Sequence, residues 1–134
     1  MTAQFLLDTN VLSNLVRHPR GRIRHRIAAV GEDQVCTSIV VAAELRYGAA
    51  KRGSARLAAQ VDAILQALDV LPLEPPCDLR YGELRAHLER NGQLIGPYDL
   101  LIATHALTLG CTVVTDNERE FSRVHGLRVE NWLK

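Results

Sequence analysis

Short, continuously apolar runs alternate with longer helical stretches along this chain, and this alternation constrains the fold more than any other feature. The clearest runs lie at residues 4–7, 35–37, 70–71 and 112–115, and none shows the polar alternation of a half-exposed strand. Strands of this kind are buried on both faces, as in a parallel sheet that helices cover on each side. The sequence therefore predicts an α/β fold with a central, mostly parallel sheet flanked by helices.

Capping and breaking residues delimit the predicted helices. Ser38 and Pro97 suit the start of a helix, and Gly31 and Gly110 suit its end. We expect helices near residues 11–16, 22–30, 39–51, 54–68, 75–90, 98–109 and 117–121, and a last strand near 127–129.

Length, charge and cysteine usage narrow the class of protein. The chain has 134 residues and a net charge of +1, so we expect a single domain over residues 1–134 and only a local surface for RNA. The three cysteines form no pair motif, which favours buried, reduced thiols. Too few apolar residues precede Asp8 for a signal-peptide core, and no run could span a bilayer. We therefore expect a soluble, cytoplasmic protein.

Four acidic residues occupy positions where the predicted sheet would bind a ligand. Asp8 and Asp116 directly follow predicted strands, Asp99 lies in the first turn of a helix, and Glu44 lies about two turns into another. Ligands of open α/β sheets bind at the carboxyl ends of the strands. These side chains, drawn from segments far apart in the chain, could therefore converge on one edge of the sheet.

Such convergence calls for a cation, because neighbouring carboxylates repel one another and some would otherwise retain protons. Hard divalent ions such as Mg²⁺ and Mn²⁺ prefer oxygen ligands and bind through carboxylates, water and substrate phosphate. Such an ion can activate water and stabilise the leaving oxygen of a phosphodiester. The pattern favours metal-assisted hydrolysis.

Four motifs in the same order resemble those of PIN-domain nucleases. They are Phe-Leu-Leu-Asp8-Thr-Asn10, Ser38-x5-Glu44-Leu-x-Tyr-Gly48, Tyr98-Asp99-x2-Ile102-Ala103 and Val114-Thr115-Asp116-Asn117-x2-Glu120-Phe121. Within that family the chain is similar to VapC toxins, the ribonuclease half of type II toxin–antitoxin pairs. The similarity extends over essentially the whole chain.

This resemblance implies a PIN-like three-layer fold and RNA hydrolysis with Mg²⁺ or Mn²⁺. It implies that Asp8, Glu44, Asp99 and Asp116 form the catalytic set, with Asp8, Asp99 and Asp116 on the metal. The polar residues expected to support them are Asn10, Ser38, Thr115 and Asn117, whereas Glu120 is a variable fifth acid outside the core set.

The resemblance also implies partners. A VapB-type antitoxin would block the cleft, and the chain would form a homodimer, for which the apolar stripe of Leu57, Val61, Ile64 and Leu68 is a candidate surface if it does not belong to the core. The last residues, from Glu120 to Trp132, resemble VapC toxins that cut initiator tRNA in the anticodon stem-loop. Trp132 itself is expected to anchor the C-terminus.

Several features also allow simpler interpretations. Asp8 could only cap a helix, Asp116 could only belong to a turn, and Asp99 could only complement a helix dipole. Glu44 could pair with Arg46 or another arginine. The arginine-rich segment 17–26 could hold RNA phosphates or be a solvated helix face. His105 is expected to be a packed, hydrogen-bonded histidine. The alternative function is a non-catalytic PIN-type module that binds RNA or antitoxin. A phosphatase or receiver domain is disfavoured, because neither of the two lysines follows a strand.

Overall fold

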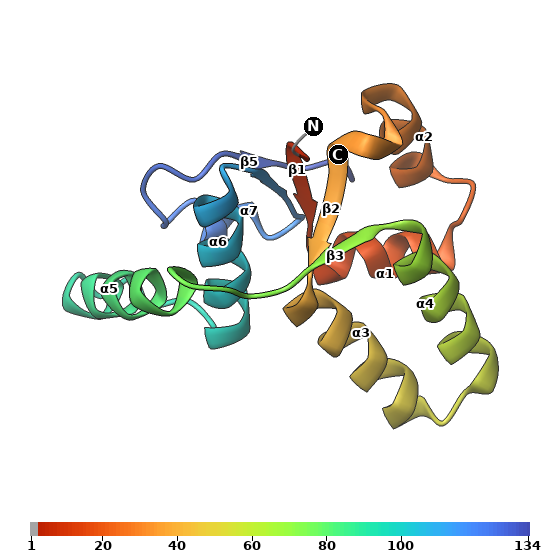
Figure 1. Cartoon of the computed structure of the whole chain (residues 1–134), viewed down its shortest axis with the longest axis horizontal. Coiled ribbons are helices and arrows are strands. Elements are labelled where there is room, and N and C mark those ends of the chain that lie inside the picture. The colour runs from red at the N-terminus through yellow and green to blue at the C-terminus, as the bar shows by residue number, and fades with distance from the viewer. Residues whose placement is uncertain (1–2) are drawn as a thin grey trace.

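The computed structural model describes residues 3–134 and shows in them one five-stranded sheet whose neighbouring strands are all parallel (Figure 1). The strands are β1 (Phe5–Leu7), β2 (Val35–Ser38), β3 (Asp69–Leu71), β4 (Thr112–Val114) and β5 (Val129–Glu130). They lie in the order β3-β2-β1-β4-β5, so β1 occupies the centre. The predicted fold class and the parallel sheet are confirmed.

Helices cover the sheet in two groups. Figure 1 shows α1 to α4 on one side and α5 to α7 on the other. The helices are α1 (Thr9–Arg17), α2 (Arg22–Val30), α3 (Ile39–Arg52), α4 (Ala55–Ala67), α5 (Cys77–Arg90), α6 (Pro97–Leu109) and α7 (Glu118–Phe121), with a short 3₁₀ turn at Glu32–Gln34. That turn was not predicted. The last strand begins later than expected, because the N–H of Leu127 donates to the carbonyl of Val124 and keeps Leu127 in a turn.

Local chemistry explains where the main helices begin and end. The side chains of Asp8, Ser38 and Ser54 each accept a hydrogen bond from a backbone N–H two or three residues later, at 3.0, 3.1 and 3.1 Å. Gly53 and Gly110 end α3 and α6 with positive φ angles of 63° and 73°, a conformation that glycine adopts without steric cost.

The course of the chain through the sheet places a topological switch point beside β1. From β1 the chain passes to β2 and then β3 on one side, and it later returns to β4 and β5 on the other. The strand order thus reverses between β1 and β4. Crevices form at such switch points, outside the carboxyl ends of the strands. Asp8 and the segment 115–117 lie at this position.

Buried side chains agree with several predictions. Cys36, Cys77 and Cys111 are free and buried, as expected. His105 is buried, with its Nδ1 at 2.8 Å from the Ser38 hydroxyl, so its predicted packed role is confirmed. Within the predicted apolar stripe, Val61 is buried in the core and its neighbours pack against it.

The part of the chain that the structure describes contains no helix both long enough and apolar enough to cross a membrane.

The C-terminal segment is fixed to the sheet by Trp132, as predicted. Only 1% of its surface is exposed, its ring lies 5.2 Å from that of Phe5, and the Arg26 guanidinium lies 5.1 Å above it. Arg22 donates to the carbonyl of Leu133 at 2.7 Å. Two arginines of the segment 17–26 therefore hold the C-terminal residues, a role that neither sequence interpretation included.

Truncation of this anchor should destabilise the fold. We expect Trp132→Ala to lower the free energy of unfolding by about 3–5 kcal/mol, because it removes a buried ring and leaves a cavity. Urea unfolding followed by circular dichroism measures the change. Leu79→Ala, at a side chain that is 64% exposed on α5, is the control and should stay within about 0.5 kcal/mol. Equal, small effects of both changes would contradict the anchoring role.

Candidate active site at the carboxyl end of the sheet

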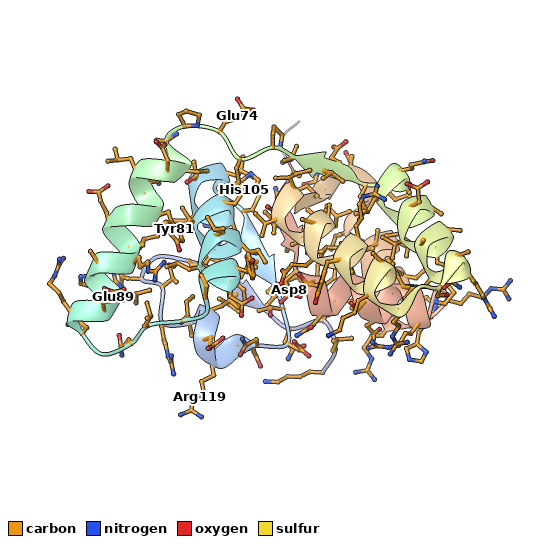
Figure 2. All side chains as sticks on the ribbon, turned by 90° about the horizontal axis from the view of Figure 1, so that it is seen from below. Asp8, Glu74, Tyr81, Glu89, His105 and Arg119 are labelled. Carbon is orange, nitrogen blue, oxygen red and sulfur yellow. The ribbon has the colours of Figure 1, made fainter. Side chains whose placement is uncertain are left out.

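Parallel pairing of β1 with β4 brings Asp8 to the end of the neighbouring strand. Leu7 is in register with Val114, and the backbone N–H of Asp8 donates to the Val114 carbonyl at 3.0 Å. The hydroxyl of Thr115, the next residue after β4, donates to the carboxylate of Asp8. Figure 2 shows Asp8 in the middle of the molecule, between α6 and the helices of the N-terminal half.

Asp8 combines a capping role with an unusual electrostatic environment. Its Oδ1 accepts from the N–H of Val11 and caps α1, while its Oδ2 accepts from Thr115. Only 4% of its surface is exposed. Burial raises the pKa of Asp8 to about 6, and the charges of Asp116 and Asp99 act in the same direction, against these two hydrogen bonds. Capping alone therefore does not account for this residue.

Asp99 lies in the first turn of α6 and faces two other acids. Burial raises its pKa to about 6, and so do a hydrogen bond and repulsion with Glu120 and the repulsion of Glu44. The side-chain amide of Asn117 opposes this effect by donating to Asp99 at 3.3 Å, and it also donates to Glu120 at 2.7 Å. A helix-dipole role would not require these neighbours.

Glu44 points toward α1 rather than toward an arginine. Its Oε1 accepts a hydrogen bond from the hydroxyl of Thr9 at 2.7 Å. Arg46, the partner of the simpler interpretation, instead pairs with Asp62 at 3.3 Å. The alternative of a salt bridge between Glu44 and Arg46 or another arginine is therefore wrong, since no ion pair of the described residues includes Glu44.

Asp116 follows β4 at the same end of the sheet. It is exposed, and its Oδ1 accepts from the side-chain amide of Asn10 at 3.0 Å. Since its charge contributes to the raised pKa of Asp8, the two carboxylates are neighbours. The structure thus brings together the side chains of Asp8, Asp99, Asp116 and, through Asp99, Glu44.

Among the four residues expected to support the acids, Asn10, Thr115 and Asn117 donate to acidic side chains. Ser38 does not, since its hydroxyl caps α3 and pairs with His105. It affects the acidic group only through the helix that carries Glu44.

Two neighbours of the acidic group lie outside the set predicted from the sequence. Thr9, which was not singled out, fixes Glu44, and Glu120, expected only as a variable fifth acid, lies against Asp99. The spacing of Glu120 was the available signal, because a residue three positions after Asn117 lies one helical turn away in α7.

The acidic group has no cationic partner within residues 3–134. The ion pairs found there involve Glu130, Asp62, Glu89 and Glu118, all outside the group. Hydroxyls and amides hold the carboxylates, and no three Asp, Glu, His or Cys side chains are grouped as metal ligands in these residues. An oxygen-only donor set with an uncompensated negative charge fits a hard divalent cation. Loading one would require these carboxylates to turn toward a common point.

Comparisons with known proteins identify relatives over nearly the whole chain. The family model described as "PIN domain" matches residues 5–127. The chain is 37% identical over 130 residues to the "tRNA(fMet)-specific endonuclease VapC" of Shigella flexneri, covering 96% of this chain and 98% of that protein. It is 36% identical over 132 residues to "Ribonuclease VapC2" of Rickettsia felis, covering 97% and 98%.

Solved structures show the same similarity. DNA-bound VapBC from Salmonella typhimurium contains a chain with a TM-score of 0.90 and 37% identity, covering 98% of this chain and 99% of that one. VapBC2 from Rickettsia felis, bound to a promoter DNA fragment, gives a TM-score of 0.88 and 33% identity, with coverages of 96% and 98%.

The burial of Asp8 predicts how the stability of the fold depends on pH. Its pKa is about 6 in the folded chain, against an ordinary value of 3.8. Between these values the folded chain binds more protons than the unfolded chain, so its stability falls as the pH rises through this window. We expect Asp8→Asn to raise the free energy of unfolding at pH 8 by up to about 3 kcal/mol, and to have no such effect near pH 4.

Denaturant unfolding at several pH values measures this difference. The matched control is Glu74→Gln, an exposed acid on the loop before α5 (Figure 2), which should leave the profile unchanged. A destabilised Asp8→Asn variant at pH 8 would show that the carboxylate is favourable in the fold without a cation, against the account given above.

Proposed function

The chain belongs to the PIN-domain family of VapC ribonucleases, and from this premise we propose that it is an endoribonuclease toxin that hydrolyses RNA phosphodiester bonds with the aid of Mg²⁺ or Mn²⁺. One observation carries the proposal. Asp8 and Asp99, 91 positions apart in the chain, are neighbouring half-buried or buried carboxylates with pKa values raised to about 6. A fold gains no stability from such a pair, whereas a cation-dependent active site requires it.

The residues of this site would have different roles. Asp8 and Asp99, with Asp116 beside them, would hold the divalent ion, and Glu44 would position water at its edge. When bound, the ion supplies positive charge for the phosphate and makes water more acidic. Thr115, Asn10 and Asn117 keep the carboxylates oriented by donating hydrogen bonds to them.

The substrate that we propose is initiator tRNA. The relatives from Shigella flexneri and Salmonella typhimurium are both named "tRNA(fMet)-specific endonuclease VapC", at 37% and 38% identity. The similarity of the last residues does not itself indicate contact with RNA, because Trp132 is buried against Phe5 and cannot stack on a base. The proposal therefore rests on the similarity of the whole chain.

A VapB-type antitoxin is the proposed inhibitor, since the similar chains from Salmonella typhimurium and Rickettsia felis come from VapBC complexes. The uncompensated carboxylates of Asp8 and Asp99 would accept a cationic side chain from such a partner. The alternative, a PIN-type module that binds RNA or antitoxin without catalysis, predicts binding with no turnover.

The proposal also includes the domain organisation of the protein and its location in the cell. One sheet and its helices account for residues 3–134, so we treat residues 1–134 as one nuclease domain, of which the first two residues lie outside the described part. An enzyme that cuts tRNA would act in the cytoplasm.

A homodimer is also part of the proposal, with a different surface from the one suggested by the sequence. The stripe on α4 packs largely inward, whereas Ile39, Tyr47 and Tyr98 are large exposed side chains. They flank a mostly apolar groove of about 830 Å³ between α3 and α6. Exposed apolar patches of this kind are typical of association surfaces.

Digestion of RNA tests the enzymatic function. Purified protein should cut the anticodon stem-loop of initiator tRNA when Mg²⁺ or Mn²⁺ is present, and EDTA should stop it. Asp99→Asn should lower kcat by roughly 100-fold or more, because it removes a charge needed in the transition state. Glu89→Gln on α5, which pairs with Arg85, is the control. Added antitoxin should also stop digestion.

RNA that is bound but stays intact with every divalent ion would favour the non-catalytic alternative. Cleavage that survives EDTA and Asp99→Asn would rule out the proposed site.

The association surface can be tested separately. We expect Ile39→Asp and Tyr98→Glu together to convert a dimer to a monomer, because they place charge in an apolar contact. Sedimentation equilibrium gives the mass directly. Leu79→Asp, on the far helix α5, should leave the dimer intact. A wild-type chain with the mass of one copy at all concentrations would exclude the dimer.

A further inference from the structure

A cleft leads away from Glu44 between α1, α3 and α4. The hydrogen-bonded pair of Thr9 and Glu44 lies at one end, and Arg17 and Arg52 lie at the other. The cleft has a volume of about 230 Å³, its floor includes apolar side chains such as Leu57 and Val61 of α4, and no aromatic side chain lines it. It joins the two arginines to the Glu44 carboxylate.

The arrangement follows from the periodicity of two neighbouring helices. Each helix contributes a column of residues spaced four apart, which places them on one face. The columns are Thr9, Ser13 and Arg17 on α1, and Glu44, Gly48 and Arg52 on α3. Since eight residues of helix extend about 12 Å, the arginines lie well beyond the position of a phosphate at the carboxylates.

Arg17 and Arg52 remain available for a ligand. Both side chains are exposed, and neither has an ion-pair partner among the described residues. Arg26 and Arg46, by contrast, are already engaged in ion pairs with Glu130 and Asp62. The two free guanidinium groups therefore form a local positive end in a chain of nearly zero net charge.

Gly48 keeps the middle of the cleft open. Glycine inside a helix is less stable than alanine, yet nothing lies within 4 Å of where a Cβ would stand at this position. Packing therefore does not require glycine here. The missing side chain leaves free space in the cleft between Glu44 and the two arginines.

We propose that this opening, the Arg17/Arg52 cleft, is a subsite for the RNA backbone in which the two arginines bind a phosphate adjacent to the scissile one. The inference rests on the proposed ribonuclease function of the acidic group. Guanidinium groups match phosphate oxygens in a two-pronged geometry, and backbone charge dominates RNA affinity. Because no aromatic ring lines it, the cleft suits the RNA backbone rather than a base. The carboxylate at one end repels phosphates, so the RNA would extend toward the arginines at the other end.

The test compares two double variants of equal charge. Arg17→Ala/Arg52→Ala removes the positive end of the cleft, whereas Arg80→Ala/Arg90→Ala removes two exposed arginines from α5. Binding of a fluorescein-labelled initiator tRNA anticodon stem-loop is measured by anisotropy in an Asp99→Asn background, so that the RNA stays whole. We expect Kd to rise roughly tenfold for the cleft variant and the slope of log K against log salt to flatten by about 1.4.

Kinetics of the active enzyme provide a second measurement. The cleft variant should raise KM by a similar factor and change kcat less than about twofold, because the arginines bind a phosphate that does not react. Gly48→Leu should weaken RNA binding by filling the cleft, without lowering the melting temperature, because leucine is a good helix former.

Four outcomes would overturn the inference. RNA affinity and salt slope that match those of the α5 control, with cleavage intact, would leave the enzyme function standing and remove the subsite. A lower melting temperature of the arginine variant without weaker RNA binding would assign the arginines to the helix dipoles. Loss of antitoxin binding alone would assign the cleft to an acidic segment of that protein. A wild-type chain that neither cuts nor binds RNA would refute both proposals together.

Discussion

Repulsion between carboxylates gathered at one end of the sheet is the constraint on which the rest of this structure depends. Asp8 and Asp99 are brought together by the parallel pairing of β1 with β4 and by the position of α6, and burial makes their charges unfavourable. The fold tolerates this because hydroxyl and amide donors hold the acids in place and the rest of the core supplies the stability. The same repulsion favours the binding of positive charge at the site, whether from a divalent ion or from a partner's side chain.

The residues that support the fold around the site are not the acids proposed to take part in the reaction. Ser38 caps α3 and contacts His105 inside the core, so it fixes the helix that carries Glu44 without approaching the acids. At the opposite end of the strands, Trp132 packs on Phe5 and is covered by Arg26. Arg26, a candidate for RNA contact in the sequence, thus stabilises the scaffold together with Ser38 and Trp132, and the acidic end of the sheet is left free for the reaction.

The Thr9–Glu44 pair lies between two surface hollows. On one side lies the Arg17/Arg52 cleft, with two exposed arginines at its end, and on the other lies the apolar groove between α3 and α6. Because α3 contributes to both, one helix connects the proposed RNA subsite, the acidic group and the proposed association surface. Binding of RNA, a second copy and an antitoxin would therefore all affect the orientation of the same helix.

The sequence by itself determined the elements and the candidate acids. Continuously apolar runs indicate buried parallel strands, caps such as Ser38 mark helix starts, and Asp8 and Asp116 follow strands directly, because all of these signals are local. Only the tertiary structure decided the partners: Thr9 for Glu44, Glu120 for Asp99, Asp62 for Arg46, and the cleft that joins Arg17 to Arg52. Such pairs depend on strand order and on the rotation of each helix against its neighbour, and these are set by packing between distant segments, which no local pattern encodes.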